Sequence, residues 1–396
     1  MSHSAGRVLL VVPSATSFRT FLTEAATEWR RRGGDIAVAT GPELPGHQSA
    51  LPSEGVEWLE MPSMRLGTFT GLARAAGSLR RHVQRWQPDV VHAHFAAAAC
   101  VAAITRTAFR RNASEWMATF HGMHLTAGPA LRSRAVSAVE VWAARRMSLV
   151  CVLNREDRDA LGRRMPPERI HLHESCGVGC DLGAFDPSRF SPAERRATRE
   201  RLGIPCDALV AAYVGRQVAF KGYPAAVRGF LESQRHGLEA WLVLVGSADD
   251  AHSSGLTAAE QRAIAGHPRI VRLGWQQDVA PFLAAADVTI LPSTREGMPV
   301  SAMESLAVGT PVITVDSRGC RDVVRDGIDG VVLAEPAPSL IARTLLEFRD
   351  DPLKLQRFHA GALAGRARFD RRLFAGEQAD IYSRLLHKAL PLREGS

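Results

Sequence analysis

Short apolar runs alternate with amphipathic stretches along both halves of the chain. The runs are rich in Val, Leu, Ile and Ala and are bounded by turn residues, which indicates strands buried on both faces of a parallel sheet. This pattern predicts an α/β fold with two doubly wound, Rossmann-like domains. The predicted strands are residues 8–12, 36–40, 90–92, 116–120 and 149–153 in the first half, and 209–214, 241–245, 270–273, 288–291, 312–315 and 331–333 in the second.

A stretch rich in turn residues, 177–205, separates the two halves, and it contains Asp186-Pro187 and Ser191-Pro192. The last helical pattern of the chain carries Ile381, Leu385 and Leu386 as apolar contacts. The predicted parts are an N-terminal domain over residues 1–185, a C-terminal domain over 186–373, and a C-terminal helix within 374–396 that crosses back to the N-terminal domain.

Positive charge is concentrated in the first domain. The net charge is +8, and residues 1–150 hold 17 arginines against 10 acidic residues. Many of these arginines flank the apolar stripes of two predicted helices, at 72–86 and 131–142. A solvated helix face is the simplest explanation, and contact with an anionic membrane surface or a phosphorylated acceptor is the functional alternative. Because no nucleic-acid-reading motif accompanies these arginines, nucleic acid is not an expected partner.

Nothing in the composition indicates export or a membrane span. The apolar run 8–12 after Arg7 is too short for a signal peptide, and the run 95–104 is about half of the ~20 residues needed to span. The six cysteines form no paired CxxC clusters, and Cys176 and Cys180 lack the second pair that a metal site needs. We expect reduced thiols in a cytoplasmic protein, with peripheral contact at the inner face of the plasma membrane as an option.

The most informative segment contains two glutamates, Glu296 and Glu304, with seven residues between them. It follows a predicted strand, and Pro299 suits the first position of a helix. On that helix Glu304 shares a face with Val300 and Ser301, and the free N–H groups at the helix start would point at an anion. Two carboxylates beside an anion site suit a charged, polyhydroxylated ligand.

A loop flanked by glycines supplies cations in the same half of the chain. It begins with Gly215-Arg216 and ends with Lys221-Gly222. Glycine lets the backbone approach a ligand closely, and an Arg and a Lys five positions apart can clamp a diphosphate. The chain has only three lysines, so Lys221 suggests a need for a compact point charge.

In the first half, His121 ends a predicted strand and precedes Gly122, a place suited to substrate contact. Since a lone histidine is more often structural, the pattern alone leaves both interpretations open. His92 and His94 end an earlier strand, and we expect them to be scaffold or part of the cleft wall rather than metal ligands.

The sequence predicts neither a metal nor a cofactor. Asp157-Arg-Asp159 matches a short metal-binding pattern, but Asn154 can cap a helix there, and acidic residues are favoured in a first helical turn. No glycine-rich dinucleotide fingerprint follows the first strand.

Four segments together resemble the family 4 retaining glycosyltransferases, whose GT-B fold places two Rossmann-like domains across a cleft. The segment around His121 is similar to that of capsule, exopolysaccharide and lipid-linked oligosaccharide members, which commonly act on polyprenyl-diphosphate-linked sugars at the inner membrane face. The resemblance implies metal-free transfer of a hexose or N-acetylhexosamine from a nucleotide sugar, most often UDP-linked, to a glycan acceptor. The four segments are Ala118 to His124, Gly177-Val-Gly179 with Asp181, Gly215-Arg216 to Lys221-Gly222, and Glu296 to Pro311.

The resemblance also implies roles for individual residues. Arg216 and Lys221 would neutralise the diphosphate, Glu304 would bind the ribose, and Glu296 would hold the donor sugar. His121 would reach the donor sugar and the reacting phosphate from the other domain. The predicted nucleotide-sugar-binding residues are Gly215, Arg216, Lys221, Glu296, Gly297, Met298, Pro299, Val300, Ser301 and Glu304; the predicted catalytic residues are His121, Arg216, Lys221 and Glu296.

The chain departs from the family pattern at two places. Many relatives have paired glycines in the first βα turn, where this chain has Ser14 to Arg19. In the segment Asp316 to Asp322, Asp322 stands where family members commonly have a glutamate. Three alternatives stay open from the sequence: a soluble small-molecule acceptor, a nucleotide-sugar epimerase of the same fold, and a noncatalytic sugar- or nucleotide-binding regulator.

Overall fold

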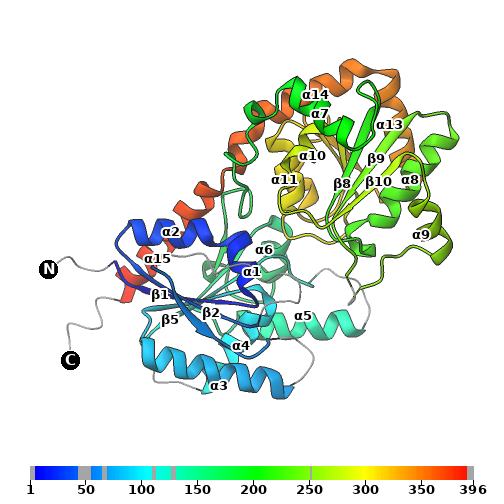
Figure 1. The fold of residues 1–396 in the computed structure, drawn as a ribbon. Coiled ribbons are helices and arrows are strands. Elements are labelled where there is room, and N and C mark those ends of the chain that lie inside the picture. The colour runs from blue at the N-terminus through cyan, green and yellow to red at the C-terminus, as the bar shows by residue number, and fades with distance from the viewer. Residues whose placement is uncertain are drawn as a thin grey trace. The chain divides into compact units, whose positions relative to one another are not determined.

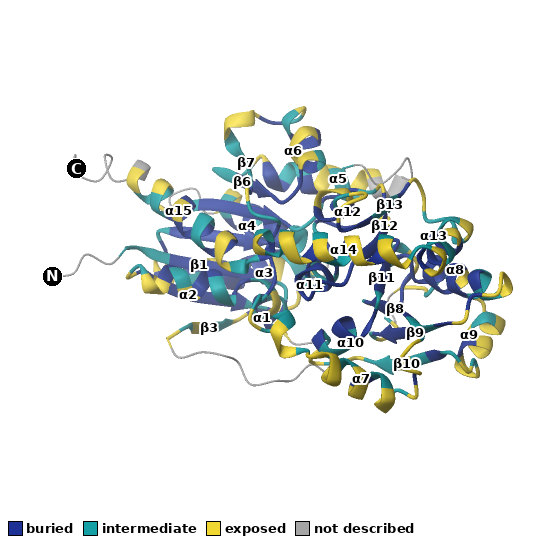
Figure 2. Ribbon diagram, turned by 90° about the horizontal axis from the view of Figure 1, so that it is seen from above, coloured by how far each residue is buried: buried dark blue, intermediate teal, exposed yellow. Residues whose placement is uncertain are grey.

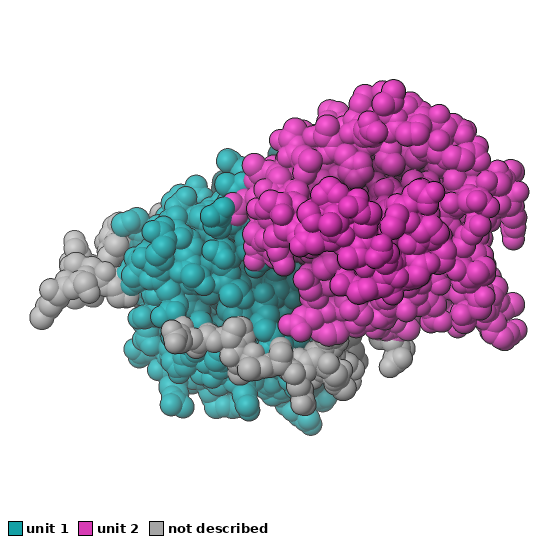
Figure 3. Space-filling view, turned by 45° about the horizontal axis from the view of Figure 1, so that its top comes forward, with its two compact units in different colours: residues 1–178, 371–396 teal, residues 179–370 magenta. Residues whose placement is uncertain are grey.

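Each half of the chain forms its own parallel sheet. The computed structural model describes residues 5–42, 55–64, 69–108, 113–125, 131–249 and 252–389. Residues 1–178 and 371–396 make up unit 1, and residues 179–370 make up unit 2 (Figure 3). The prediction had placed the corresponding boundaries after residues 185 and 373.

Unit 1 is built on a seven-stranded parallel sheet in the order β3-β2-β1-β4-β5-β6-β7. Helices α3 and α5 lie on one face, and α2 and α15 on the other (Figure 1). The strand order reverses between β1 and β4, which is where ligands bind in such sheets. The strands are β1 (Arg7–Val12), β2 (Asp35–Thr40), β3 (Glu57–Glu60), β4 (Val90–His94), β5 (Glu115–Phe120), β6 (Leu149–Val152) and β7 (Ile170–Leu172). The helices are α1 (Ala15–Phe21), α2 (Thr23–Arg31), α3 (Phe69–Trp86), α4 (Phe95–Ala108), α5 (Leu131–Ala144), α6 (Arg155–Gly162) and α15 (Arg371–Ala389), with a 3-10 turn at Pro167–Arg169.

Unit 2 repeats this plan with six parallel strands in the order β10-β9-β8-β11-β12-β13. Its order reverses between β8 and β11. The strands are β8 (Leu209–Val214), β9 (Ala240–Val245), β10 (Ile270–Gly274), β11 (Val288–Leu291), β12 (Val312–Val315) and β13 (Gly330–Leu333). The helices are α7 (Pro192–Arg201), α8 (Tyr223–Arg235), α9 (Ala258–Ala265), α10 (Ala280–Ala285), α11 (Val300–Ala307), α12 (Cys320–Val323), α13 (Pro338–Asp350) and α14 (Pro352–Gly365), with 3-10 turns at Pro187–Arg189, Ala219–Lys221 and Arg366–Phe369.

The inner strands are buried along almost their whole length (Figure 2), which explains why they read as continuous apolar runs. All the strands predicted from the sequence are present. The prediction missed β3 and β7, which are the two edges of the first sheet. An edge strand has one neighbour and need not be apolar throughout: β3 reads Glu-Trp-Leu-Glu, and β7 has only three residues.

The C-terminal helix α15 belongs to unit 1. Its Tyr382 is buried, packs edge-on against Trp29 of α2, and lies with its hydroxyl 2.7 Å from Nδ1 of His92 in β4. Glu377 ties the same helix to the chain after β7, because its carboxylate accepts the backbone N–H groups of Glu174 and Ser175 at 2.9 and 3.2 Å. The helix therefore completes the core and the edge of the first sheet.

Within the described part of the chain, no helix combines the length and the hydropathy that a membrane span requires.

Replacing Tyr382 with Phe should lower the free energy of unfolding by about 1–3 kcal/mol, because it removes one partner of a buried histidine and leaves that nitrogen unsatisfied. Urea unfolding at neutral pH measures the loss. The matched control on the same helix is Leu373→Ala, whose side chain is exposed and should change stability by less than about 0.5 kcal/mol. Equal stability of the Tyr382→Phe and wild-type proteins would contradict this role for α15.

Candidate functional site

Two loops meet at the switch point of unit 2, one after β8 and one after β11. Gly222 ends the first loop with a φ of +75°, and a Cβ there would lie 2.2 Å from the carbonyl oxygen of Pro292. Two residues of the second loop, Ser293 and Thr294, donate hydrogen bonds to the carbonyl oxygen of Phe220 at 3.1 and 3.0 Å. Only glycine satisfies both the conformation and the close approach, so the two loops interlock.

The interlocked loops bring together Lys221 and Glu296, two residues predicted from the sequence to bind different parts of one ligand. Lys221 Nζ donates to Oε1 and Oε2 of Glu296 at 2.6 and 2.8 Å. Glu296 is only 7% exposed, and a buried carboxylate needs such a cationic partner. Arg318 donates from Nε to the backbone carbonyl of Glu296 at 2.9 Å and holds the turn in place.

Arg216 is paired with a different carboxylate, that of Asp249. Its Nη1 donates to Oδ2 of Asp249 at 2.5 Å, and its guanidinium lies over the ring of Phe220, 5.3 Å from the centroid. About half of its side chain is exposed. In this structure Asp249 holds Arg216 and Glu296 holds Lys221, so an incoming diphosphate would compete with a carboxylate for each cation.

Helix α11 begins at Val300, and Pro299 is its N-cap rather than its first residue, which corrects the sequence prediction by one position. A proline side chain cannot cap, and no side-chain hydrogen bond closes this helix start. Among the described residues, no protein acceptor bonds the N–H groups of Val300 and Ser301. These two residues and Glu304 are partly exposed, so the shared face predicted from their spacing is present and is suited to an anion.

Three other residues predicted to bind the nucleotide sugar lie in the same two loops. Gly297 is buried, Met298 is partly exposed, and Gly215 opens the first loop with a φ of +155°. A Cβ on Gly319 would lie 2.4 Å from the carbonyl oxygen of Gly297, so the chain after β12 also packs directly against the turn.

In unit 1, His121 lies in a cluster of rings at the carboxyl ends of β4 and β5. Its Nε2 is 3.1 Å from Nδ1 of His94, and its ring stacks on Phe95 with centroids 4.0 Å apart. Phe95 has a φ of +72°, a strained conformation for a non-glycine residue and one that recurs at functional sites. The ring of Phe21 in α1 lies 5.6 Å from His121, so three elements fix its orientation.

His92 and His94 are scaffold, as expected, since both are wholly buried. His92 joins Thr119 through Nε2 at 2.8 Å and Tyr382 through Nδ1 at 2.7 Å. Burial lowers the pKa of His92 and of His94 well below the usual histidine value. Burial also lowers the pKa of His121, aided by the nearby His173. The imidazole of His121 is therefore neutral at physiological pH.

Beside the possible metal-binding pattern, Asn154 caps a helix, as the sequence predicts. Asn154 accepts the N–H of Asp157 at 2.8 Å and caps α6, while Asp157 accepts the N–H of Met123 and so fixes the loop after His121.

One cluster in the described chain has metal-ligand chemistry that the sequence analysis missed: His171, His173 and Glu377. Its carboxylate lies 2.7 Å from His171 Nε2 and 3.2 Å from His173 Nδ1, and it already accepts two backbone N–H groups. We interpret the cluster as the clamp between β7 and α15.

Two further features of the site were not predicted. Asp249, the partner of Arg216, follows β9, and Trp275 follows β10 with 60% of its surface exposed. Both follow strands at the same edge of the sheet as Gly215. The signal in the sequence was present for Trp275, an aromatic residue directly after a strand-ending glycine.

Two family models match the chain along most of its length. The model of glycosyl transferases group 1 matches residues 194–363, and the model of the glycosyl transferase 4-like domain matches residues 18–174. The chain belongs to the GT4-type glycosyltransferases.

Curated relatives agree with this family. A D-inositol 3-phosphate glycosyltransferase of Thermobispora bispora is 28% identical and aligns with 88% of this chain and 83% of its own length. The putative glycosyltransferase EpsD of Bacillus subtilis is 25% identical over 77% of this chain and 79% of its own.

Solved structures show the same GT-B fold. Anabaena HepE in complex with UDP-glucose aligns with a TM-score of 0.76 at 18% identity, covering 96% of this glycosyltransferase and all of HepE. Sucrose-phosphate synthase from Thermosynechococcus elongatus aligns with a TM-score of 0.78 at 18% identity, with the same coverage.

Acidification should destabilise unit 1 because burial lowers the pKa of four of its histidines: His92, His94, His121 and His173. As the pH falls below about 6.5, these histidines bind protons in the unfolded chain but stay neutral in the folded state. The free energy of unfolding therefore falls by up to about 1.4 kcal/mol per pH unit for each histidine. Urea unfolding between about pH 7.5 and 5.5 measures this slope. The control His236→Gln, at an exposed position in unit 2, should leave it unchanged. A free energy of unfolding that stays constant over this range would contradict the prediction.

Proposed function

We propose that this glycosyltransferase transfers a hexose or N-acetylhexosamine from a UDP-sugar to a glycan acceptor carrying phosphate, with retention of configuration. The observation that carries the proposal is the buried Lys221–Glu296 pair beside the uncapped start of α11. A cation, two unused backbone N–H groups and two carboxylates suit a sugar diphosphate and its hydroxyls. The UDP-glucose complex of HepE supports the choice of nucleotide.

Breaking the bond between the sugar and the diphosphate places negative charge on the leaving group. Lys221, Arg216 and the start of α11 would stabilise that charge, which lowers the barrier when the donors are already in place. No protein nucleophile and no metal are required. The acceptor hydroxyl would attack from the face that the diphosphate leaves, and a phosphate oxygen would take its proton.

Separate parts of the ligand would engage the two glutamates. When the diphosphate binds Lys221, the carboxylate of Glu296 is released to accept hydrogen bonds from the sugar hydroxyls. Glu304, one helical turn after Val300 and Ser301, would accept hydrogen bonds from the ribose. Trp275 offers an exposed ring on which the base can stack.

We propose that the neutral imidazole of His121 hydrogen-bonds a substrate hydroxyl. The stacked Phe95 and the hydrogen bond to His94 hold the ring in one orientation, so little entropy is lost on binding.

A basic cavity of about 530 Å³ in unit 1 supports a phosphorylated acceptor. Four arginines line it, and none has a carboxylate partner among the described residues. Three of them donate to backbone carbonyls instead, and the guanidinium of Arg146 also lies over the ring of Trp142 at 4.1 Å. The cluster consists of Arg134, Arg145, Arg146 and Arg164. Its uncompensated charge suits an anion.

Two acceptors share that chemistry. A polyprenyl-diphosphate-linked saccharide at the inner membrane face fits the basic charge of this unit and the similarity of the segment around His121 to capsule and exopolysaccharide members of the family. A phosphorylated cyclitol is the second candidate, because several relatives are named D-inositol 3-phosphate glycosyltransferases. A screen of nucleotide sugars by thermal stabilisation, followed by transfer assays with both acceptors, tests the whole proposal. Stabilisation by none of the nucleotide sugars would refute it.

Glu296→Gln should lower kcat by about 100-fold with little change in UDP affinity, because its carboxylate serves the transferred sugar. Glu304→Gln should instead weaken UDP binding by about tenfold, the loss expected for one charge-assisted hydrogen-bond acceptor. Calorimetric titration with UDP and a transfer assay separate the two effects. The control is Glu335→Gln, an exposed position in the same unit. Wild-type UDP affinity in both variants would sink the assignment of Glu304.

The double variant Arg134→Gln and Arg145→Gln should raise KM for a phosphorylated acceptor by about tenfold or more at low salt, and less at high salt. Hydrolysis of the donor without acceptor should stay unchanged. The matched control is Arg85→Gln, an exposed arginine on α3 outside the cavity. The acceptor that loses activity, lipid-linked or soluble, identifies the natural class; equal loss with a neutral acceptor would exclude phosphate recognition.

A further inference from the structure

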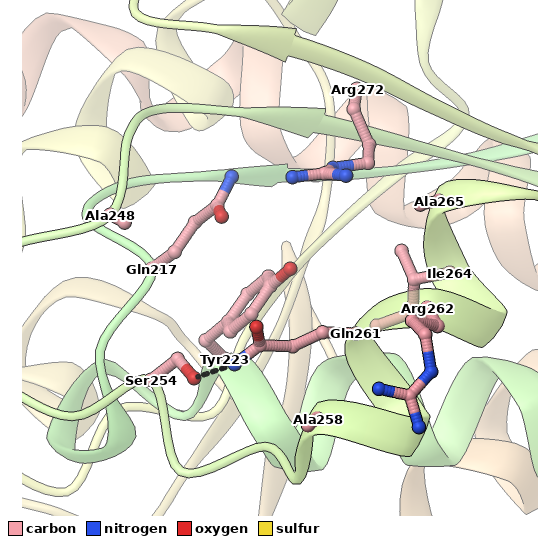
Figure 4. Close-up of a pocket in the computed structure, with 10 residues that line it drawn as sticks. All are labelled: Gln217, Tyr223, Ala248, Ser254, Ala258, Gln261, Arg262, Ile264, Ala265 and Arg272. Atoms are coloured by element: carbon pink, nitrogen blue, oxygen red, sulfur yellow. Dashed lines mark hydrogen bonds between the residues drawn. The ribbon is translucent and has the colours of Figure 1, made fainter.

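Unit 2 contains a second cavity, of about 550 Å³, lined by the start of α8, by α9 and by β10 (Figure 4). Its floor is buried and consists of Gln217, Tyr223 and Ile264. Its rim is exposed and carries Arg262 and Arg272. None of the residues assigned above to the donor lines it, so it is separate from the proposed donor site.

The guanidinium groups of this cavity have no carboxylate partner among the described residues. Neither the side chain of Arg262 nor that of Arg272 forms a hydrogen bond or an ion pair there. The described acidic groups on neighbouring segments are engaged: Asp249 binds Arg216 and His252, and Glu260 binds Arg228 and caps α9. An anion in the cavity would therefore meet the guanidinium of Arg272 without displacing a described carboxylate, whereas the guanidinium of Arg262 points away from Arg272 (Figure 4).

A buried hydroxyl points into the same space. Tyr223 is only 4% exposed, and Figure 4 shows its hydroxyl directed between Gln217 and Arg272. Among the described residues, this hydroxyl has no hydrogen-bond partner. Burial raises the pKa of Tyr223 and the charge of Arg272 opposes that rise, which agrees with their proximity. This hydroxyl opens into the cavity and can hydrogen-bond a ligand there.

Polar groups around the cavity supply further hydrogen bonds. Gln217 donates from Nε2 to the carbonyl oxygen of Gly246 at 2.8 Å, which leaves its side-chain oxygen as an acceptor facing the cavity (Figure 4). Gln261 donates to Ser254 Oγ at 3.2 Å and keeps its own oxygen in the same way. Two amide oxygens suit the hydroxyl groups of a small polyol.

We propose that this cavity binds a small phosphate monoester of a polyol. The guanidinium of Arg272 can bind two phosphate oxygens in bidentate fashion, and the Tyr223 hydroxyl adds a donor. A phosphate monoester carries more negative charge than a carboxylate and has more acceptor oxygens for these donors. The volume lies within the range of small-molecule sites.

The cavity lies against both ends of the loop that carries Arg216 and Lys221. Gln217 directly follows Arg216, and Tyr223 is separated from Lys221 by Gly222 alone. A ligand that contacts Gln217 and Tyr223 stabilises one conformation of that loop. The ligand site itself does not depend on the function proposed for the loop.

The test is titration of the full chain with sn-glycerol 3-phosphate by calorimetry, in the presence of saturating UDP. We expect binding that is weakened by about tenfold or more in Arg272→Gln and less in Tyr223→Phe, which removes only the unpartnered hydroxyl. The matched control is Arg235→Gln, an exposed arginine on α8 outside the cavity, which should bind as the wild type does. Circular dichroism establishes that each variant is folded.

Three outcomes would overturn the proposal. The first is no binding of sn-glycerol 3-phosphate to the wild type, and the second is wild-type affinity in both Arg272→Gln and Tyr223→Phe. The third is tighter binding of glycerate than of sn-glycerol 3-phosphate. Binding that Lys221→Ala abolishes and Arg272→Gln leaves intact would place the phosphate at the donor loop and overturn it as well. A failure of UDP to bind would refute the proposed function alone, since the Arg272→Gln comparison still reports on the cavity.

Discussion

The ion pair between Lys221 and Glu296 is the constraint on which the proposed donor site of unit 2 depends. A carboxylate that is almost fully buried requires a cation, and this cation comes from a loop about 75 positions earlier in the chain. The two loops can meet only because β8 and β11 are neighbours at the point where the strand order reverses. Gly222 permits the approach, since a side chain there would collide with the backbone of Pro292. Topology, glycine and ion pair thus support one another.

In unit 1 the candidate site residue His121 is positioned by buried side chains, whereas in unit 2 Lys221 and Glu296 are positioned by an ion pair. Burial lowers the pKa of His92, His94 and His121, and these three side chains hydrogen-bond one another, Thr119 and Tyr382. The last helix of the chain is needed for that environment, because Tyr382 contacts both His92 and Trp29. The same packing that orients His121 is the reason we expect unit 1 to lose stability in acid.

Each unit has a proposed anion site. The arginines suited to such a site differ from the others in lacking a carboxylate partner. Arg199 and Arg325 are paired with Asp287 and Asp329, and they hold elements together. The arginines of the two cavities have no carboxylate partners among the described residues. A net charge of +8 therefore matters less than its distribution, since only an unpaired guanidinium attracts an anion without losing another contact.

The alternation of apolar runs was enough to predict the α/β class and every inner strand, because buried parallel strands leave a local signature. The GT-B family was predicted from the resemblance of four motif segments. The edge strands β3 and β7 escaped detection because β3 begins and ends with glutamate and β7 has only three residues, so neither forms an apolar run. The spacing of Glu296 and Glu304 likewise placed Glu304 on the exposed face of α11 that Val300 and Ser301 share. No local pattern could show that Glu296 pairs with Lys221, that Asp249 holds Arg216, or that Glu377 clamps two histidines. Those contacts join residues tens to hundreds of positions apart, and only the packing of sheets and helices brings them within hydrogen-bonding distance.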